Sequence, residues 1–504
     1  MSQLPDYVAS AKPNPPENRV PWLTSTAAAY AGIMLWFVFW MGVPSGGSGF
    51  AAGALSQGLL FAIISVIIAA FICYFCFYHV PGMLGMKTGL PLYIVGTSTY
   101  GVTGGFLLPG FLMGCLQFGW LAVNGYGAGK GFALIAGHAE MSFMHVGVGI
   151  LWAVVAAFIG LKGMKYVGMV ASYLPIIPIV ALLVLLVCTV GGVFKFEPEK
   201  AIGDSKVAIA TATATAEENK AKEDKKSDAE VETIKNEAYA KALENTKVVG
   251  LYGTGTLGSL AGQLGVLSLI CAYIVGFFAT AGAAGCDFGS NNKDRSAVIW
   301  GGLVGIAGTT IFTGVIALMA IAGAQAKLEG SLDPYANMKL LTGESVGGWF
   351  MLLLAIAAFP SACVSSFIAA NSFKTTLPKV NPFISCGIGT IVACLLIAVG
   401  VAGQLGAVFG FIGASFGPVC GAMMADYLLA GNKWAGPRAG FNLAGWISFV
   451  VGFLVGGLPL LGIGADVIPC PPVSAFVVGF VLYYLLAKAG LESKKLDMPQ
   501  RIDA

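Results

Sequence analysis

Long apolar runs separated by short polar segments fill the sequence from residue 26 to residue 486. A helix needs about 20 residues to cross about 30 Å of hydrocarbon, and most of these runs reach that length. Twelve runs can be marked, at residues 26–44, 54–78, 104–134, 143–161, 167–193, 257–281, 297–323, 348–373, 383–402, 405–429, 441–461 and 473–486. The pattern predicts an all-α integral membrane protein with about twelve transmembrane helices.

Lysine and arginine are distributed unevenly over the connections between these runs. If residue 1 lies in the cytoplasm, fifteen of them fall in the tails and internal connections, and three in the short external ones. The internal residues are Lys12, Arg19, Lys87, Lys162, Lys165, Lys293, Arg295, Lys374, Lys379, Lys433, Arg438, Lys488, Lys494, Lys495 and Arg501, and the external ones are Lys130, Lys327 and Lys339. Positive residues favour the cytoplasmic side, so we expect a multi-pass protein of the cell membrane with both termini cytoplasmic.

One long polar connection, residues 194–256, interrupts the apolar pattern. Residues 195–247 hold ten lysines and twelve acidic residues, and long loops cross the membrane largely regardless of charge. The connection is therefore predicted to lie outside the cell. The alternating alanine and threonine of residues 208–216 suggest a flexible stem that precedes a solvated helix, either as a mobile appendage or as a docking element for a partner.

The polar insert also divides the chain into parts of related size. Five spans precede it and seven follow, and an odd number of spans in a repeat makes the second repeat inverted. We expect cytoplasmic tails at 1–25 and 490–504, repeats at 26–193 and 257–430, the insert at 194–256, and two peripheral spans within 431–489. Glycine and proline in WFVFWMGVPSGGS (36–48) and glycine in TAGAAG (280–285) predict helix breaks in the first and sixth spans.

Composition excludes several functions. The chain is 57% hydrophobic and only 11% charged, against about 25% charged in soluble domains, and its net charge of +3 is too small to indicate nucleic-acid binding. Cys73 and Cys76 form a C-x-x-C without a second pair, which favours packing over zinc binding. No motif indicates an enzyme, and no cofactor is predicted.

Several segments, in order along the chain, resemble the nucleobase–cation symport family and specifically its cytosine permease branch. They are GMKTGL, YGVTGGFLLPGFL and CLQFGW between residues 85 and 120, GFFATAGAAGCDF at 276–288, and FIGASFGPVCGAMMADYLL at 411–429. The resemblance implies a LeuT-like fold with a five-plus-five inverted repeat, two peripheral helices and alternating access. It also implies cation-coupled transport of cytosine or a purine, with hydantoin, allantoin or a vitamin as alternatives, and a non-transporting sensor or scaffold as an alternative of another class.

The third predicted span carries the first group of candidate substrate residues. Gln117, Trp120 and Asn124 are spaced i, i+3 and i+7 and share one helix face. An indole offers a stacking plane, and carboxamides both donate and accept hydrogen bonds, which suits the polar edge of a nucleobase. The alternative is that these side chains only pack or hydrogen-bond between helices.

The resemblance places further residues at the site. On the sixth span these are Phe277, Phe278, Thr280 and Ala281, and a phenyl ring there is expected to close a sandwich with Trp120. On the eighth span, AAFPSACVSSFIAAN (357–371) departs from the family's paired threonines followed by asparagine. Depending on the register, Ser361 or the pair Ser365 and Ser366 would supply the cation ligands, unless these serines bond to their own helix. The coupling ion is expected to be Na+, with H+ as the alternative. Asp287 and Asp426 are interpreted as ion-pair residues at helix ends.

Overall fold

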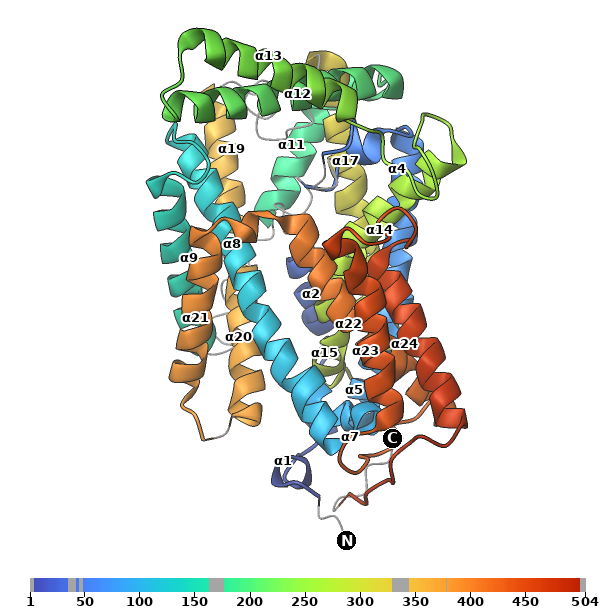
Figure 1. The fold of residues 1–504 in the computed structure, drawn as a ribbon. Helices are drawn as coiled ribbons and strands as arrows, with labels where there is room; N and C mark the ends of the chain where they lie inside the picture. Colours follow the sequence, from blue (N-terminus) through green and yellow to red (C-terminus); the bar gives the residue numbers. More distant parts are fainter. Residues whose placement is uncertain are drawn as a thin grey trace.

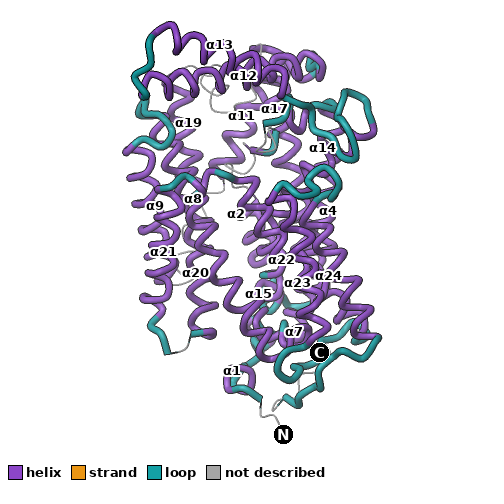
Figure 2. The backbone as a smooth tube through the Cα atoms, in the orientation of Figure 1, coloured by secondary structure: helices purple, strands orange, loops and turns teal. Residues whose placement is uncertain are grey.

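The computed structural model describes residues 4–34, 42–44, 49–162, 176–328, 344–377 and 379–498. Helices build all of the regular structure in this part of the chain, and pairing between extended segments is limited to isolated bridges (Figure 2). Both chain ends lie at the same end of the helix bundle, which we call the terminal face (Figure 1).

The first set of helices follows a short amino-terminal helix, α1 (Asp6–Ala9). Its members are α2 (Ala28–Met34), α4 (Leu59–Ile72), α5 (His79–Thr88), α6 (Leu92–Val95), α7 (Thr97–Gly105), α8 (Met113–Ile135), α9 (Phe143–Lys162) and α11 (Ile176–Val193). Wider π-helical turns, η4 (Cys73–Tyr78) and η5 (Phe106–Leu112), join α4 to α5 and α7 to α8. The second and third predicted spans therefore extend well beyond their apolar runs, toward the terminal face.

The second set follows the polar insert. Its helices are α14 (Leu260–Ala283), α15 (Gly285–Gly289), α16 (Arg295–Gly302), α17 (Thr309–Leu328), α19 (Glu344–Ala357), α20 (Phe359–Thr376), α21 (Pro382–Ala398), α22 (Leu405–Leu429), α23 (Leu443–Gly457) and α24 (Pro471–Lys488). The turn η6 (Leu303–Gly308) joins α16 to α17.

Among the described residues, ten helical segments are long and apolar enough to cross a membrane. They match the predicted spans two to eight and ten to twelve, while the ninth is the shorter helix α21. Residues 35–41 of the first span lie outside the described residues, as do residues 167–175 of the fifth. The chain is a multi-pass membrane protein.

Among the described residues, the sixth and eighth membrane spans are each divided between two helices. In the sixth span, α14 ends at Ala283 and α15 begins at Gly285, inside the predicted break. In the eighth span, α19 and α20 meet at Ala358, with Pro360 in the first turn of α20, where its missing N–H costs little. The predicted break at 36–48 lies outside the described residues except for residues 42–44.

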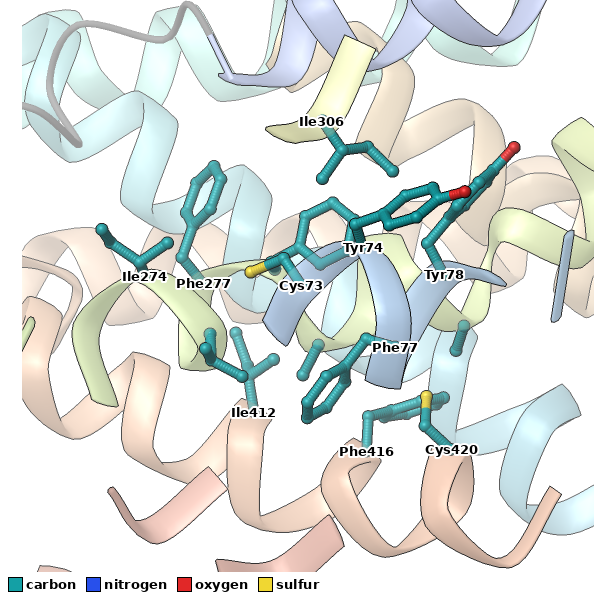
Figure 3. Close-up of a cluster of buried hydrophobic side chains, with 14 of the residues drawn as sticks. Cys73, Tyr74, Phe77, Tyr78, Ile274, Phe277, Ile306, Ile412, Phe416 and Cys420 are labelled. Carbon is teal, nitrogen blue, oxygen red and sulfur yellow. The ribbon is translucent and has the colours of Figure 1, made fainter. Parts of the chain in front are cut away.

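The core of the bundle lies where η4, α14 and α22 meet. Phe77 from η4, Ile274 from α14 and Phe416 from α22 point into one buried cluster (Figure 3). Glycines on α22 allow a second close contact, with α24. A Cβ added at Gly421 would lie 2.1 Å from the carbonyl oxygen of Phe476. Small residues at such positions let membrane helices touch backbone to backbone.

The polar insert forms a helical hairpin, α12 (Pro198–Glu223) and α13 (Asp228–Asn245), across the end of the bundle opposite the terminal face (Figure 1). The prediction of a flexible stem at residues 208–216 is wrong, because these residues lie inside α12. Thr211, Thr213 and Thr215 each donate a hydroxyl hydrogen bond to the carbonyl four residues earlier, which satisfies the hydroxyls within the helix. The hairpin is therefore an ordered element.

A buried charged network joins α22 to the loop after it and to the carboxy-terminal segment. Asp426 pairs with Arg438 at 2.9 Å, and Arg438 also pairs with Glu492 at 2.5 Å. The predicted ion-pair role of Asp426 is confirmed, with Arg438 as its partner. Within the described residues Asp287 forms no ion pair, so the same interpretation is not supported for Asp287. Its carboxylate accepts a hydrogen bond from the backbone N–H of Leu92.

Candidate functional site

A cavity of about 50 Å³ lies between α8, α14 and α20. Eight of the ten predicted site residues line it: Gln117, Trp120, Asn124, Phe277, Thr280, Ala281, Ser361 and Ser365. The described residues that line it carry no charged side chain, and its polar groups are amides, hydroxyls and the indole. Such a lining suits a neutral ligand with a polar edge, because a buried unpaired charge would be costly.

Trp120 connects α8 to α14 at the centre of this cavity. Its indole Nε1–H donates to the Thr280 hydroxyl at 3.1 Å, and both side chains are buried. The Thr280 oxygen therefore accepts from Trp120, and its own proton can be donated to a ligand. The indole is fixed in orientation by a polar contact as well as by packing.

Among the described residues, Phe277 and Phe409 pack against the indole of Trp120. Phe277 meets it edge-on at 5.0 Å and 84°, whereas Phe409 of α22 stacks on it at 5.4 Å and 29°. The sandwich that Trp120 and a ring of the sixth span are expected to form around a substrate stays a prediction; in this structure the phenyl ring of Phe277 meets the indole edge-on. Sequence reasoning missed Phe409, and the only available signal was its position near the start of the tenth span.

Asn124 links α8 to α20 beside the indole. Its Nδ2 donates to the Trp120 carbonyl at 2.8 Å, and its Oδ1 accepts from the Ser361 hydroxyl at 2.6 Å. These two bonds define which way the amide points. Ser361, predicted as a cation ligand, is in this structure a partner of the candidate substrate residue Asn124.

Gln117 lies one turn before Trp120. Its Nε2 donates to the Met113 sulfur, a weak acceptor, at 3.4 Å, and Gln117 is only 4% exposed. A buried carboxamide with such a weak partner can exchange it for a ligand at little cost. This supports its predicted role at the polar edge of a ligand.

Two predicted residues lie away from the cavity lining. Phe278 is fully buried and packs against Tyr30 with ring centroids 5.7 Å apart. The Ser366 hydroxyl donates to the Ala362 carbonyl of its own helix at 3.1 Å, and Ser365 donates in the same way to Ser361. Both hydroxyl oxygens keep lone pairs, so these bonds are compatible with binding a cation.

Additional apolar residues complete the cavity wall. They are Ile33 of α2, Ala284 at the break in the sixth span, Phe288 of α15, and Val364 and Ile368 of α20. A cavity that accepts benzene measures about 150 Å³, three times this volume. A nucleobase-sized ligand would therefore require the cavity walls to move apart. The helix break at Ala284 lies in the wall and is a place where the chain can bend to allow this movement.

Comparison with known proteins supplies the fold. No family model matches the sequence, and no curated protein matches it significantly. Among solved structures, the inward-facing conformation of Mhp1 aligns at a TM-score of 0.62, with 15% identity over 97% of this chain and 94% of Mhp1. A substrate-bound, outward-open Na+-coupled sialic acid symporter aligns at 0.58, with 12% identity over 98% of this chain and 93% of that one.

The chain has a LeuT-like fold. A closed structure of Mhp1, described as a nucleobase-cation-symport-1 family transporter with bromovinylhydantoin bound, aligns at 0.56 with 15% identity over 97% of this chain and 98% of that chain. At these identities the likeness establishes the fold and its inverted repeats. The identity of the ligand depends on the chemistry of the residues that line the cavity.

Proposed function

We propose that this protein is a secondary active transporter that moves a neutral planar heterocycle, a nucleobase such as cytosine or a purine, together with a cation by alternating access. One observation carries the proposal. An indole, two carboxamides and hydroxyl groups from three different membrane helices converge on one cavity beside a helix break, and the described residues that line it carry no charge. Stacking and mixed hydrogen bonding are what a nucleobase requires.

The LeuT-like fold supports transport, and the motifs at 85–120, 276–288 and 411–429 support the nucleobase–cation symport family and its cytosine permease branch. The second candidate substrate is a hydantoin or allantoin. Two observations favour it. The structurally similar Mhp1 has been solved with bromovinylhydantoin bound, and here the amide of Asn124 lies beside Trp120, because its Nδ2 donates to the Trp120 carbonyl. Both candidates contain a flat nitrogen heterocycle whose edge presents hydrogen-bond donors and acceptors.

We propose Na+ as the coupling ion, bound near Ser365 and Ser366 of α20, with H+ as the alternative. Hydroxyl oxygens are suitable ligands for a hard cation, and Ser365 lines the cavity while Ser366 follows it on α20. The Na+-coupled sialic acid symporter shares the fold, which supports cation coupling in general.

A thermal-shift screen tests the proposal. Purified protein is melted with cytosine, adenine, hypoxanthine, hydantoin or allantoin, in sodium or in choline chloride. A ligand at 100 times its Kd should stabilise the folded state by about 2.7 kcal/mol, and sodium should increase that shift. Uptake of the best ligand into proteoliposomes then distinguishes a transporter from a sensor, which would bind without uptake. No shift and no uptake with any of these heterocycles would refute the proposed substrate class.

A further inference from the structure

Basic residues from three elements come together beside Tyr427, a tyrosine in the last turn of α22. The Nζ of Lys87, in the last turn of α5, lies 5.9 Å from the centre of the Tyr427 ring and donates to the Asn432 carbonyl at 2.7 Å. Lys433 is the next residue after Asn432, in the loop that follows α22. Arg295, the first residue of α16, is close enough for its charge to act on the Tyr427 side chain. We call Lys87, Arg295 and Lys433 the basic cluster.

Helix packing fixes where the basic cluster lies. Helix α5 packs against both α16 and α22, so the end of α5 that carries Lys87 lies between the elements that carry the other two cations. The contact with α16 is close, because a Cβ added at Gly82 of α5 would lie 3.0 Å from Val298 Cγ1 of α16. The three cations are therefore brought together by membrane helices and their connection, and not by a chain end.

Acidic residues do not neutralise the basic cluster. In the part of the chain that the structure describes, none of its three cations forms an ion pair with a carboxylate. Asp294, beside Arg295 in the chain, accepts from the Ala297 N–H at 2.8 Å and caps α16. Asp426, near the same end of α22, is paired with Arg438. Three cations against one capping carboxylate leave a net positive charge.

A line of aromatic rings leads from the lipid-exposed side of the bundle to this charge. Phe71 of α4 and Phe75 of η4 stack with centroids 6.0 Å apart and are 39% and 54% exposed. The ring of Phe75 meets that of Tyr74 at 4.7 Å, and Tyr74 meets His79 of α5 at 5.7 Å. The Arg295 charge in turn acts on the His79 ring. Exposed apolar rings on a membrane span face lipid, so the basic cluster lies at the edge of the bundle, where hydrocarbon gives way to headgroups.

We propose that the basic cluster binds the phosphate of an anionic lipid headgroup, with the acyl chains lying along Phe71 and Phe75. The guanidinium of Arg295 offers two parallel N–H donors to phosphate oxygens, and the lysines add point charges. None of the three cations lines the cavity between α8, α14 and α20. The lipid site is therefore separate from the candidate functional site and does not depend on the proposed substrate.

The neighbouring rings favour a lipid over a soluble phosphate. Both ligands bring the same anionic group to the basic cluster, but only a lipid also brings acyl chains that cover the exposed faces of Phe71 and Phe75. Each cation close to the membrane surface strengthens the binding of an anionic lipid about fivefold. The basic cluster should therefore distinguish anionic from zwitterionic lipids that carry the same acyl chains.

Native mass spectrometry of the purified full-length protein in a neutral detergent tests the proposal. Phosphatidylglycerol and phosphatidylcholine with identical acyl chains are titrated separately, and the apparent Kd of the first bound lipid is measured. The wild type should bind phosphatidylglycerol at least about fivefold more tightly than phosphatidylcholine, and added salt should reduce this difference. Arg295→Gln and Lys87→Gln should each lose about fivefold in affinity for phosphatidylglycerol and keep their affinity for phosphatidylcholine.

Lys162→Gln is the matched control. Lys162 is an exposed cation at the end of α9, with its Nζ 5.0 Å from the Phe158 ring, but α9 packs on α8, α20 and α21. This variant should keep both wild-type affinities. Arg295 is exposed, so Arg295→Gln remains informative even if Lys87→Gln, which loses the bond to Asn432, folds poorly.

Three results would overturn the lipid site. The first is equal affinity of the wild type for the two lipids. The second is wild-type affinity for phosphatidylglycerol in Arg295→Gln. The third is displacement of phosphatidylglycerol by an equal concentration of inorganic phosphate, which would assign the basic cluster to a soluble anion instead.

Discussion

Trp120 is the residue on which recognition in the proposed site depends most. Its indole N–H donates a hydrogen bond to the Thr280 hydroxyl, and the ring of Phe409 stacks on one face of the indole. Trp120→Ala removes the plane, and base–aromatic stacking worth about 1–3 kcal/mol corresponds to about a 5-fold to 150-fold loss of affinity. Trp120→Phe should lose less, although it also breaks the bond to Thr280.

Phe118 offers a matched control on the same helix. It stacks on Phe373 at 5.8 Å and 13° and does not line the cavity. Phe118→Leu should lower the melting temperature while leaving the Kd of the folded protein unchanged. Kd and melting temperature are measured on the same preparations. Normal affinity in stable Trp120→Ala protein would eliminate Trp120 from the site.

Ser361 is predicted to act on the substrate through Asn124. Ser361→Ala removes the donor that holds Asn124 Oδ1, and a buried group left unsatisfied costs about 1–3 kcal/mol. We expect weaker binding and an altered preference among heterocycles, even in saturating sodium.

Ser365→Ala should instead weaken the dependence of substrate binding on sodium, because in a coupled transporter bound sodium and bound substrate each increase the affinity for the other. Titrations of ligand at several sodium concentrations separate the two; identical effects of both variants would contradict these assignments.

The part of the site that lies on a single helix, α8, was predictable from the sequence. Gln117, Trp120 and Asn124 lie on one face because their spacing follows the helical repeat, and the structure places all three at the cavity. Phe409 was not predictable. It reaches Trp120 from α22, and a sequence with 32 phenylalanines offers no reason to select one of them. Contacts between distant helices depend on packing that a local pattern does not contain.

At the level of elements, the apolar runs predicted most helices but not how they are interrupted or extended. The ends of α22 agree with the predicted span because its apolar run begins after a glycine turn and ends at Leu429. The extension of the second span through Thr88 was missed, because His79 and Pro81 interrupt the apolar run without ending the helix. The alternation at 208–216 was misread because period two also fits a helix whose threonines bond to their own backbone.

The hairpin of α12 and α13 should be dispensable for transport. The two helices pack mainly on each other, and Glu218 of α12 is held at 2.7 Å by Lys235 of α13. Hydrogen bonds from Lys222 and Lys235 lower the pKa of Glu218 to about 2, so its carboxylate stays charged at every physiological pH.

Deleting residues 208–245 and joining the ends with a Gly-Ser linker should leave uptake within about twofold of wild type. Lys247, whose carbonyl accepts from the Ala51 N–H at 2.9 Å, is retained in this deletion. Uptake is normalised to the amount of protein in the membrane. Loss of uptake despite normal insertion would show that the hairpin takes part in transport.

At the scale of the whole molecule, the terminal face is held together by chain segments that hydropathy does not reveal. Arg438, in the loop after α22, bonds to the Ser98 carbonyl near the start of α7 and to Glu492 in the carboxy-terminal segment. Ser98 also donates to Asp426 at 2.6 Å, and Tyr483 of α24 donates to it at 3.1 Å. The peripheral helices are thereby attached to the core by polar contacts as well as by the glycine face of α22.

This network predicts a strongly non-additive pair of substitutions. Arg438 and Asp426 are each only 3% exposed, so Arg438→Ala leaves the Asp426 carboxylate buried without its cation, at a cost of about 3–5 kcal/mol in the free energy of unfolding. Asp426→Ala likewise leaves Arg438 with Glu492 as its remaining acidic partner among the described residues. Adding Asp426→Ala to Arg438→Ala removes the stranded charge, so the double variant should be less destabilised than the sum of the two single variants. Lys433→Ala, an exposed cation in the same loop, should change stability by no more than about 0.5 kcal/mol. Unfolding free energies of the purified variants measure the coupling, and additive effects would show that the two buried charges do not act as a pair.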